Sequence, residues 1–225
     1  MQFDRREFLE HAALALALSA LPAWAQDADP TEVGPYADYA KAKPVPKGAD
    51  GYGATTAGDI EGPFYRPNAP FRERLAPAGE PGRPLQLSGR VVKGLACVPQ
   101  AGAVVDVWQA TAKGRYDNDD PRNQPAADAF HLRGRVRTNA KGEFSLRTIW
   151  PGHYAIGRDR FRPAHLHVKV SAEGCQPLTT QLYFKGDTHN AKDPWFDASR
   201  ALEPKRDDEG GWRATYELVL EESAD

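Results

Sequence analysis

The chain has 225 residues, of which 40% are hydrophobic and 27% charged, and its formal net charge is −2. Apolar and aromatic content in this range excludes a disordered chain, and the near-neutral charge provides no basic field for nucleic acid. The 20 glycines and 19 prolines disfavour a helical bundle and favour short strands joined by many turns.

The first 25 residues have the pattern of an export signal. Arg5 and Arg6 form a twin-arginine pair, and an apolar run over 12–21 follows. That run is shorter than the ~20 residues that span a bilayer, and small residues end at Ala25, where cleavage would occur. We therefore expect export by the twin-arginine route to the periplasm or medium, with no stable membrane anchor after cleavage. The alternative is a helical N-terminus with a chance arginine pair.

The mature chain divides into an arm and one folded domain. Residues 26–58 contain several prolines and no helical or strand period, which indicates a flexible N-terminal arm. The domain is expected over 59–225. Its first segment, DIEGPFYRPNAPFRERL, alternates apolar residues with prolines, so we expect it to lie extended against the core.

From Leu85 onward, short alternating runs are separated by turn residues. The sequence NAKG between two of these runs predicts one hairpin, and AEGCQP predicts another. The pattern favours an all-β fold, an antiparallel β-sandwich of about seven or more short strands with long functional loops. The expected strands are 85–92, 103–108, 133–138, 143–149, 165–170, 178–184 and 214–221. The long loops are 109–131, 150–164 and 185–212, and such loops tend to carry function.

Two cysteines, Cys97 and Cys175, lie in the mature chain. An even number of cysteines in an exported protein permits one disulfide. Two unbridged thiols are the alternative that the sequence leaves open.

The pattern HLHVKV places two histidines two residues apart on an expected strand. Side chains at i and i+2 point to one face, so His165 and His167 could bind one ion. A chance or structural histidine pair is the alternative from these two residues alone. Tyr116 in KGRYDN and Tyr154 in WPGHYAI follow glycine-containing turns beside expected strands. Phenolate oxygens are hard anionic ligands, and together with two imidazoles they would favour Fe(III) over Zn(II).

The chain resembles the intradiol ring-cleavage dioxygenases, and most closely their protocatechuate 3,4-dioxygenase branch. The resemblance covers about 59–187 and rests on six blocks in matching order: EGPFYRPNAPFRERL, LSGRVV, VVDVWQATAKGRYDN, TIWPGHYAI, FRPAHLHV and LTTQLYFKGD. It implies a β-sandwich core. This chain departs from the family where His153 and Ala155 stand at positions that are commonly proline.

The resemblance implies one non-heme Fe(III) per chain, held by Tyr116, Tyr154, His165 and His167. It implies that both atoms of O₂ enter an ortho-diphenol, protocatechuate or a related catechol, whose ring is cleaved between the hydroxyls to a cis,cis-muconate. Tyr154 would also act as a base. The implied partners are the catechol substrate and O₂, with a homo-oligomer or a mixed assembly with a related subunit.

Further site residues follow from the matching motifs. Arg162 is expected to place a permanent positive charge near developing negative charge, with a surface ion pair as its alternative. Gln181 is expected beside the pocket, with a satisfied interior amide as its alternative. The resemblance assigns the lining of the substrate pocket to Ile60, Gly62, Pro63 and Tyr65. We expect Trp108 and Gln109 to support the Tyr116 loop, and Trp150, Trp195 and Trp212 to serve packing.

Two other functions are compatible with a sandwich fold. One is a non-catalytic exported module that binds aromatic or carbohydrate ligands, although such a relative should lack at least one of the four ligands. The other is a zinc hydrolase, which would need an acidic base beside the histidines. A substrate carboxylate, as in protocatechuate, would need a cation at the pocket mouth, and the candidates are Arg66, Arg133, Arg135 and Arg158.

Overall fold

The computed structural model describes residues 55–94 and 96–223. The expected signal over 1–25 and residues 26–54 of the arm expected over 26–58 lie outside the described residues, and both stay predictions. Residues 55–58 of the arm are described, and they are hydrogen-bonded to the domain: the Thr56 N–H donates to the Val219 carbonyl at 2.9 Å, and the Thr180 hydroxyl donates to the Ala57 carbonyl at 2.8 Å. Within the described part, no helix is long and apolar enough to cross a membrane.

Short strands make up nearly all of the regular structure, and the described part contains only two 3-10 helices. The helices are η2 (Asn190–Lys192) and η3 (Ala198–Arg200). The strands are β1 (Pro84–Lys93), β2 (Val98–Pro99), β3 (Val104–Trp108), β4 (Arg133–Arg137), β5 (Glu143–Ile149), β6 (Tyr154–Gly157), β7 (Arg160–Arg162), β8 (His165–Ser171), β9 (Leu178–Phe184), β10 (Ala201–Leu202), β11 (Lys205–Arg206) and β12 (Trp212–Leu220).

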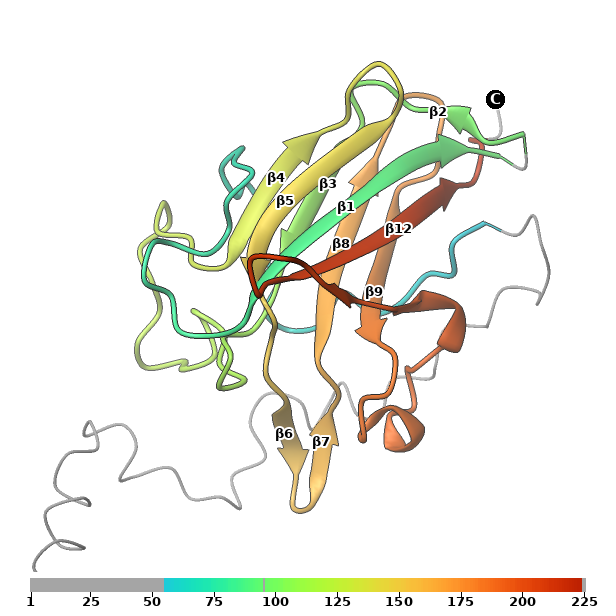
Figure 1. The fold of residues 1–225 in the computed structure, drawn as a ribbon. Helices are drawn as coiled ribbons and strands as arrows, with labels where there is room; N and C mark the ends of the chain where they lie inside the picture. Colours follow the sequence, from blue (N-terminus) through green and yellow to red (C-terminus); the bar gives the residue numbers. More distant parts are fainter. Residues whose placement is uncertain (1–54, 95, 224–225) are drawn as a thin grey trace, which may run out of the picture.

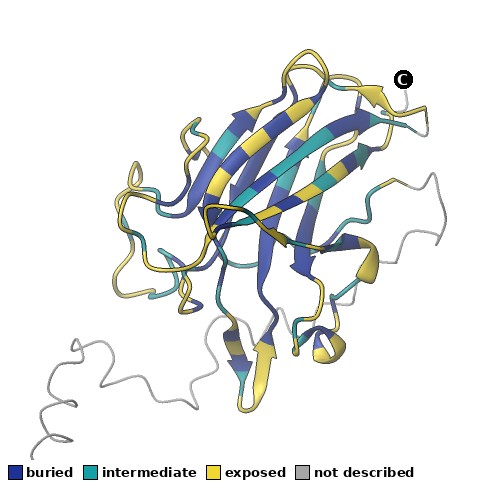
Figure 2. Ribbon diagram, in the orientation of Figure 1, coloured by how far each residue is buried: buried dark blue, intermediate teal, exposed yellow. Residues whose placement is uncertain are grey.

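Two five-stranded sheets pack face to face (Figure 1). The first has the order β11-β12-β1-β2, with β5 also paired to β1, and the second has the order β10-β9-β8-β3-β4. Leu87 and Leu146 from the first sheet meet Val105, Leu166 and Val168 from the second in a buried apolar core. Figure 2 shows this as the buried residues that run along β8 and β9 and alternate along β5. The predicted β-sandwich is confirmed.

The expectation of purely antiparallel sheets is wrong at two pairs of strands. Strand β12 runs parallel to β1, with Leu87 opposite Ala214, and the short β10 runs parallel to β9. Each parallel pair is formed by segments that no short turn connects, so local turn chemistry carried no information about their relative direction.

The hairpin expected over 133–138 and 143–149 does not form. The turn is tight, because the Asn139 N–H donates to the Glu143 carbonyl at 2.9 Å, but the strands then separate into different sheets. Strand β4 pairs with β3, and β5 pairs with β1. Val136 of β4 and Phe144 of β5 therefore contribute to the same core from the two opposite sheets. The alternation of apolar and polar residues is the same whether two consecutive strands pair as a hairpin or enter different sheets, so it could not distinguish the two arrangements. The second expected hairpin, β8 with β9, is confirmed.

The segment over 59–75 lies against both sheets as expected, with bridges at Phe71–Arg135 and Arg74–Arg147, but turns at 63–64 and 67–68 interrupt its extended course. Leu75 is fully buried, whereas Phe71 is 48% exposed and does not join the core. Cys97 is exposed, Cys175 is buried, and no disulfide joins them.

Candidate metal centre

The site is built on the outer face of the second sheet. On β8, His165 and His167 alternate with Leu166 and Val168, which point into the sandwich core. In the antiparallel register, Tyr183 of β9 lies opposite His165, and Gln181 lies opposite His167. Directly opposed residues share a face, so both of these side chains stand beside the imidazoles. The structure thus places both predicted histidines and Gln181 together.

The two imidazoles converge. Their Nε2 atoms lie 3.2 Å apart, and both side chains are buried. Nδ1 of His165 lies 2.7 Å from the Pro163 carbonyl, to which it donates as an N–H. That bond fixes the tautomer and leaves an electron pair on Nε2. Burial, followed by the nearby charge of Arg162, holds the pKa of His165 well below its usual value, and burial does the same for His167.

Apart from the contact of its Nε2 with His165, His167 is held by packing on its ring. Trp108, its opposite neighbour on β3, stacks on the imidazole with ring centroids 4.7 Å apart and an interplanar angle of 9°. Gly62 lies against the ring edge, where an added Cβ would stand 3.3 Å from Cε1. Nδ1 of His167 is buried and has no hydrogen-bond partner in the described part of the chain. The support predicted for Trp108 is therefore directed at His167, a role that the sequence did not indicate.

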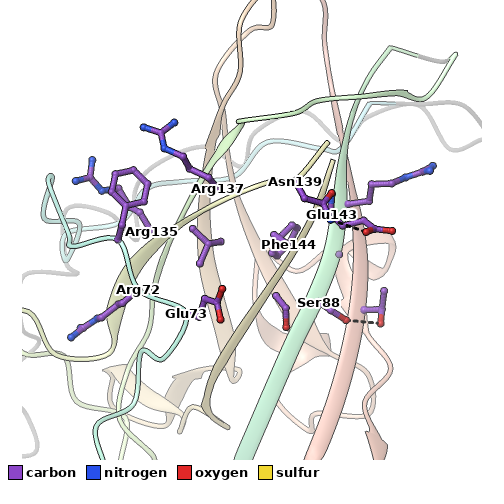
Figure 3. Close-up of a pocket in the computed structure, with 14 residues that line it drawn as sticks. Arg72, Glu73, Ser88, Arg135, Arg137, Asn139, Glu143 and Phe144 are labelled. Carbon is purple, nitrogen blue, oxygen red and sulfur yellow. Dashed lines mark hydrogen bonds between the residues drawn. The ribbon is translucent and has the colours of Figure 1, made fainter. Parts of the chain in front are cut away.

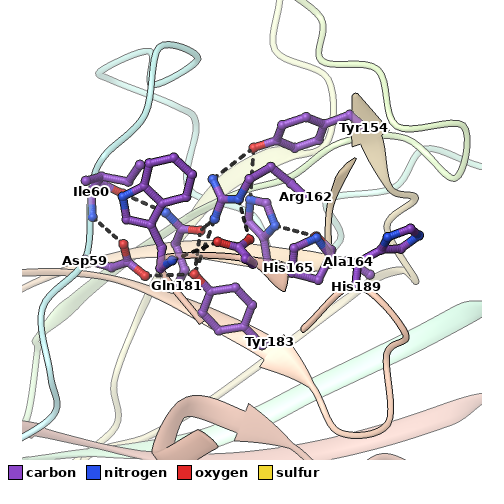
Figure 4. Close-up of polar contacts among 12 residues, drawn as sticks. Asp59, Ile60, Tyr154, Arg162, Ala164, His165, Gln181, Tyr183 and His189 are labelled. Atoms are coloured by element: carbon purple, nitrogen blue, oxygen red, sulfur yellow. Dashed lines mark hydrogen bonds and ion pairs between the residues drawn. The ribbon is translucent and has the colours of Figure 1, made fainter. Parts of the chain in front are cut away.

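Tyr154 begins β6, which pairs with β7 in a two-stranded hairpin that projects from one end of the sandwich (Figure 1). The expected long loop over 150–164 is therefore partly a hairpin. The Tyr154 hydroxyl lies 3.3 Å from Nε2 of His165 and accepts from Nη1 of Arg162 at 3.4 Å (Figure 4). Figure 4 shows these three side chains directed toward one another. The start of the hairpin thus delivers one phenol to the imidazoles.

Tyr116 reaches the same place from the loop after β3. Its ring centroid is 5.7 Å from that of Tyr154 and 6.2 Å from that of His167. The Tyr116 hydroxyl is buried and makes no hydrogen bond of normal geometry with any residue that the structure describes. Burial, and then the proximity of Tyr154, raises the pKa of Tyr116 well above its usual value. In the absence of a cation this phenol is protonated.

Two glycines allow the tyrosine-bearing segments to meet. Gly114 has φ +76°, and an added Cβ would stand 1.8 Å from the His153 carbonyl oxygen. At Gly152 an added Cβ would stand 2.4 Å from the Ala112 carbonyl oxygen, and the Gly152 N–H donates to the Thr111 carbonyl. Each glycine precedes its tyrosine by two residues, so the motifs GRY and GHY have a steric basis.

Arg162 ends β7 and is fully buried, so it is not the surface ion pair that was the alternative. Its Nε donates to the Asp193 carboxylate at 2.6 Å, and Nη2 donates to Gln181 Oε1 at 2.5 Å. Its guanidinium also lies over the Trp195 ring at 4.6 Å. Burial works against the charge, but the oxygens of Tyr154, Tyr183 and Asp193 outweigh it and raise the pKa of Arg162.

The four residues expected to line the pocket differ in which groups of the site they contact. The Ile60 carbonyl accepts from Gln181 Nε2 at 2.9 Å, and Gly62 touches His167. Pro63 is half-buried in the turn between them and Phe64. Tyr65 donates to Asp106 at 3.2 Å and packs on Trp108, so it contacts the site through that ring; burial and then Asp106 raise its pKa to about 12.

Sequence reasoning missed a set of buried polar residues behind the imidazoles. Asp193 pairs with Arg162, and Tyr183 donates to Asp59 at 2.9 Å. Asp59 also pairs with Arg200. Trp195, expected to serve packing, covers Arg162, whereas Trp150 stacks on Phe184 as expected. The only sequence signal for the set was the alternation of Gln181 and Tyr183 on β9.

Three of the four arginines considered for a substrate carboxylate are paired with other groups, although Arg133 also lies over the Tyr116 ring at 5.9 Å, and the fourth is exposed. Arg66 and Arg133 both pair with Asp117. Arg135 donates to the Ala69 carbonyl and covers Phe71. Arg158 is exposed at the tip of the β6–β7 hairpin. None of these four places a free guanidinium at the imidazoles.

A surface groove of about 1050 Å³ lies elsewhere, over β1, β4 and β5 (Figure 3). It is lined by Arg72, Arg135, Arg137 and the exposed Phe71, and shares no residue with the metal centre. Arg72 donates to the Phe130 and Arg133 carbonyls, so its polar groups are used in holding loops. The groove therefore contains none of the candidate metal ligands.

The donor set fits a trivalent iron. Two imidazole nitrogens converge, two phenols stand beside them, and one phenol oxygen is buried without a hydrogen bond. Among the described residues, no group of three His, Cys, Asp or Glu side chains comes together as a metal site, so the available anionic ligands are phenolates. A highly charged cation can displace the phenol proton, and hard anionic oxygens favour Fe(III). Apolar rings of Phe64, Trp108 and Trp195 enclose the site.

Comparison with known proteins agrees with this architecture. Residues 60–221 match the family described as Dioxygenase (Dioxygenase_C). The chain is 35% identical over 158 residues to a chlorocatechol 1,2-dioxygenase of Rhodococcus opacus, covering 62% of this chain and 60% of the relative. It is 39% identical over 146 residues to catechol 1,2-dioxygenase 2 of Acinetobacter lwoffii, covering 58% and 51%. The chain thus spans between about half and three fifths of the length of these curated relatives.

A solved structure matches over nearly its whole length. It is the dioxygenase domain of a dioxygenase carbohydrate-binding protein fusion from Streptomyces sp. SirexAA-E. The identity is 37% and the TM-score 0.64, covering 75% of this chain and 99% of the other. With the family match over 60–221, this shows that the chain belongs to the intradiol dioxygenase family.

Proposed function

We propose that the protein is a non-heme Fe(III) intradiol dioxygenase that cleaves catechols between their two hydroxyls, with both atoms of O₂ entering the muconate product. One observation carries this proposal: His165, His167, Tyr154 and Tyr116 converge in one buried site of a chain that belongs to the intradiol family. The relatives named above are catechol and chlorocatechol 1,2-dioxygenases, which supports an ortho-diphenol as the substrate class.

His165, His167, Tyr116 and Tyr154 would hold the iron. When bound, Fe(III) supplies a Lewis acid that accepts both catechol oxygens and a redox centre that makes the ring reactive toward O₂. Both hydroxyl protons of the substrate must leave; the oxygen of Tyr154 would take one of them, and a hydroxide ion that the substrate displaces would take the other. That oxygen accepts from Nη1 of Arg162, which stabilises its negative charge and later that of the substrate.

The surrounding side chains select the substrate. Phe64 stacks on Tyr116 with ring centroids 4.4 Å apart, and Ile156 and Trp195 complete an apolar enclosure that excludes water. The four arginines considered for a substrate carboxylate are held by Asp117, by Phe71 and Ala69, or stand at an exposed hairpin tip. We therefore propose uncharged catechols as preferred substrates over protocatechuate, because burying a carboxylate without a partner is costly.

Oxygen uptake on a panel of catechols, with iron quantified in the same sample, tests the proposal. We expect one iron per chain, a visible tyrosinate-to-iron absorption band, and one O₂ consumed per ring cleaved. Catechol and chlorocatechol should react faster than protocatechuate. A folded protein that lacks iron after loading and consumes no O₂ with any catechol would contradict the proposal.

We also propose export through the twin-arginine route, on the basis of Arg5, Arg6 and the short apolar run that follows them. Cell fractionation of wild type and an Arg5→Lys/Arg6→Lys variant tests this, and the variant should remain in the cytoplasm. A homo-oligomer or a mixed assembly stays a prediction that sedimentation of the mature protein can test.

A further inference from the structure

Arg162 is held from behind by a buried carboxylate. Its Nε donates to Asp193 Oδ2 at 2.6 Å, and the two side chains are 2% and 0% exposed. Asp193 is itself fixed, because its Oδ1 accepts from the Trp195 N–H at 2.8 Å. The Trp195 ring in turn covers the guanidinium, with its centroid 4.6 Å from Cζ of Arg162. The short turn over 193–195 thus contacts the guanidinium at one edge, through Asp193, and on one face, through Trp195.

These contacts leave one guanidinium nitrogen, Nη1, directed at the metal centre. Nη2 is occupied by Gln181 Oε1 at 2.5 Å and by the Tyr183 hydroxyl at 3.3 Å. Nη1 makes only a long contact, 3.4 Å to the Tyr154 oxygen (Figure 4). A guanidinium is planar, so fixing Nε and Nη2 also fixes where Nη1 points.

A second layer holds Gln181 and Tyr183. Gln181 Nε2 donates to the Ile60 carbonyl at 2.9 Å, which orients its oxygen toward Arg162. The Tyr183 hydroxyl donates to Asp59 at 2.9 Å, so its lone pairs remain available to Nη2. Asp59 is paired with Arg200, whose Nη2 donates to the Trp195 carbonyl at 2.8 Å. The chain of contacts returns to the same turn that carries Asp193.

We infer that Asp193 is a positioning residue that aims Nη1 of Arg162 at the oxygen of Tyr154 and at the bound substrate. A buried ion pair contributes little net stability relative to apolar residues of similar size, so stability alone does not account for this pair. What the pair does supply is a fixed direction for a charged group in a dry site, where orientation decides how well developing charge is stabilised. The inference rests on the proposed function, because the reacting oxygen belongs to the proposed iron ligand Tyr154.

The test is Asp193→Asn in the iron-loaded protein. An asparagine that keeps its oxygen on the Trp195 N–H turns its NH₂ group toward Nε–H of Arg162, and two donors cannot bond. We expect kcat to fall by about 10- to 100-fold, with the KM for catechol changed little and iron content unchanged. The tyrosinate absorption band should shift, because the Nη1 contact to Tyr154 is lost. A merely structural role would lower the melting temperature and leave the band where it is.

Asp207→Asn is the matched control. Asp207 also accepts an arginine Nε, from Arg213 at 3.2 Å, and a backbone N–H, from Gly211 at 2.7 Å, but it lies at the β11–β12 turn outside the site. We expect its kcat and absorption band to equal those of wild type. If Asp193→Asn also shows the wild-type kcat and band, the inference is overturned while the proposed function stands.

A double variant keeps the inference testable if Asp193→Asn fails to fold with Arg162 left as an unpaired buried charge. Arg162→Gln/Asp193→Asn removes both charges, and its kcat should equal that of Arg162→Gln alone, because Asp193 acts through Arg162. A further drop as large as that expected for Asp193→Asn would show that Asp193 acts apart from Arg162, which overturns the inference. A wild type without iron or oxygen uptake would overturn the proposed function and this inference together.

Discussion

Nε2 of His165 and Nε2 of His167 lie 3.2 Å apart, both buried on one face of β8. A cation that binds here can replace the proton between the two nitrogens, because each neutral imidazole can carry its proton on Nδ1 and offer the electron pair of Nε2. The Tyr154 oxygen lies 3.3 Å from the first nitrogen. The geometry is therefore that of a cation site, and it leads to predictions for the iron-free as well as the loaded protein.

Tyr116→Phe should change stability and activity in opposite directions. The buried Tyr116 hydroxyl makes no hydrogen bond of normal geometry to any described residue, so removing it should stabilise the iron-free protein by about 1 kcal/mol. The same change removes an iron ligand, and ring cleavage should be lost together with much of the visible band. Denaturant unfolding of the iron-free protein and oxygen uptake of the loaded one measure the two effects. Retained colour with full activity would refute Tyr116 as a ligand.

The iron-free protein should lose stability as the pH falls below about 6.5, the pKa of unfolded histidine. Burial, and then nearby positive charge, depresses the pKa of His165 and His167 in the folded state. The unfolded chain therefore binds protons that the folded chain does not, and stability is full above that pH. The loss should approach about 1.4 kcal/mol per pH unit for each histidine.

Urea unfolding of the iron-free protein at several pH values between 5 and 8 measures this slope. A His165→Gln/His167→Gln variant should show a flatter profile, because the two titrating groups are gone. Equal slopes in the variant and the wild type would assign the acid sensitivity to other groups.

Gly114→Ala should prevent the two tyrosine segments from meeting. Its Cβ would stand 1.8 Å from the His153 carbonyl oxygen, a distance that the backbone must open to relieve. We expect a large loss of stability and of iron binding. Gly79→Ala is the control, because Gly79 has φ +80° but open space around it, and this change should cost only about 1 kcal/mol of backbone strain. Thermal unfolding with iron quantification compares the pair, and equal effects of the two changes would mean that the contact is unimportant.

Asp117→Asn should destabilise the loop that carries Tyr116. Asp117 pairs with the buried Arg133 and with Arg66, and breaking a buried pair on one side costs about 3–5 kcal/mol. Glu203→Gln breaks the exposed pair with Lys185 and should change stability by less than about 1 kcal/mol. Denaturant midpoints of the two variants give the comparison, and similar small shifts would contradict the role of Asp117.

Sequence patterns anticipated the layers of the fold better than the connections between strands. Alternation identified β8 and β9, and their turn fixed the antiparallel register that sets Gln181 beside His167. The same kind of signal wrongly predicted a hairpin of β4 and β5, because Val136 and Phe144 face one core from two sheets. Strand direction between β1 and β12 depends on contacts far apart in the chain, which local patterns do not encode.

The two histidines and two tyrosines expected to meet do so, because a short motif holds each of them: HLH on one strand, GRY and GHY at glycine turns. Asp193, the carboxylate partner of Arg162, was not anticipated, and neither was the pair of Asp59 with Arg200. Asp193 lies 31 residues after its partner Arg162, and Asp59 lies 141 residues before its partner Arg200. Both aspartates are in irregular segments, and only the folded chain brings each of them to its arginine. Burial of a lone arginine implies such partners but does not identify them.

The most direct test is the reaction of the iron-loaded protein with catechol under O₂, followed by visible absorption, oxygen consumption and product analysis. We expect a coloured protein whose band changes when catechol binds, consumption of one O₂ per catechol, and cis,cis-muconate as the product. Tyr154→Phe and His167→Gln should abolish the reaction. A colourless protein that contains iron yet cleaves no catechol, or one that cleaves the ring outside the two hydroxyls, would contradict the account.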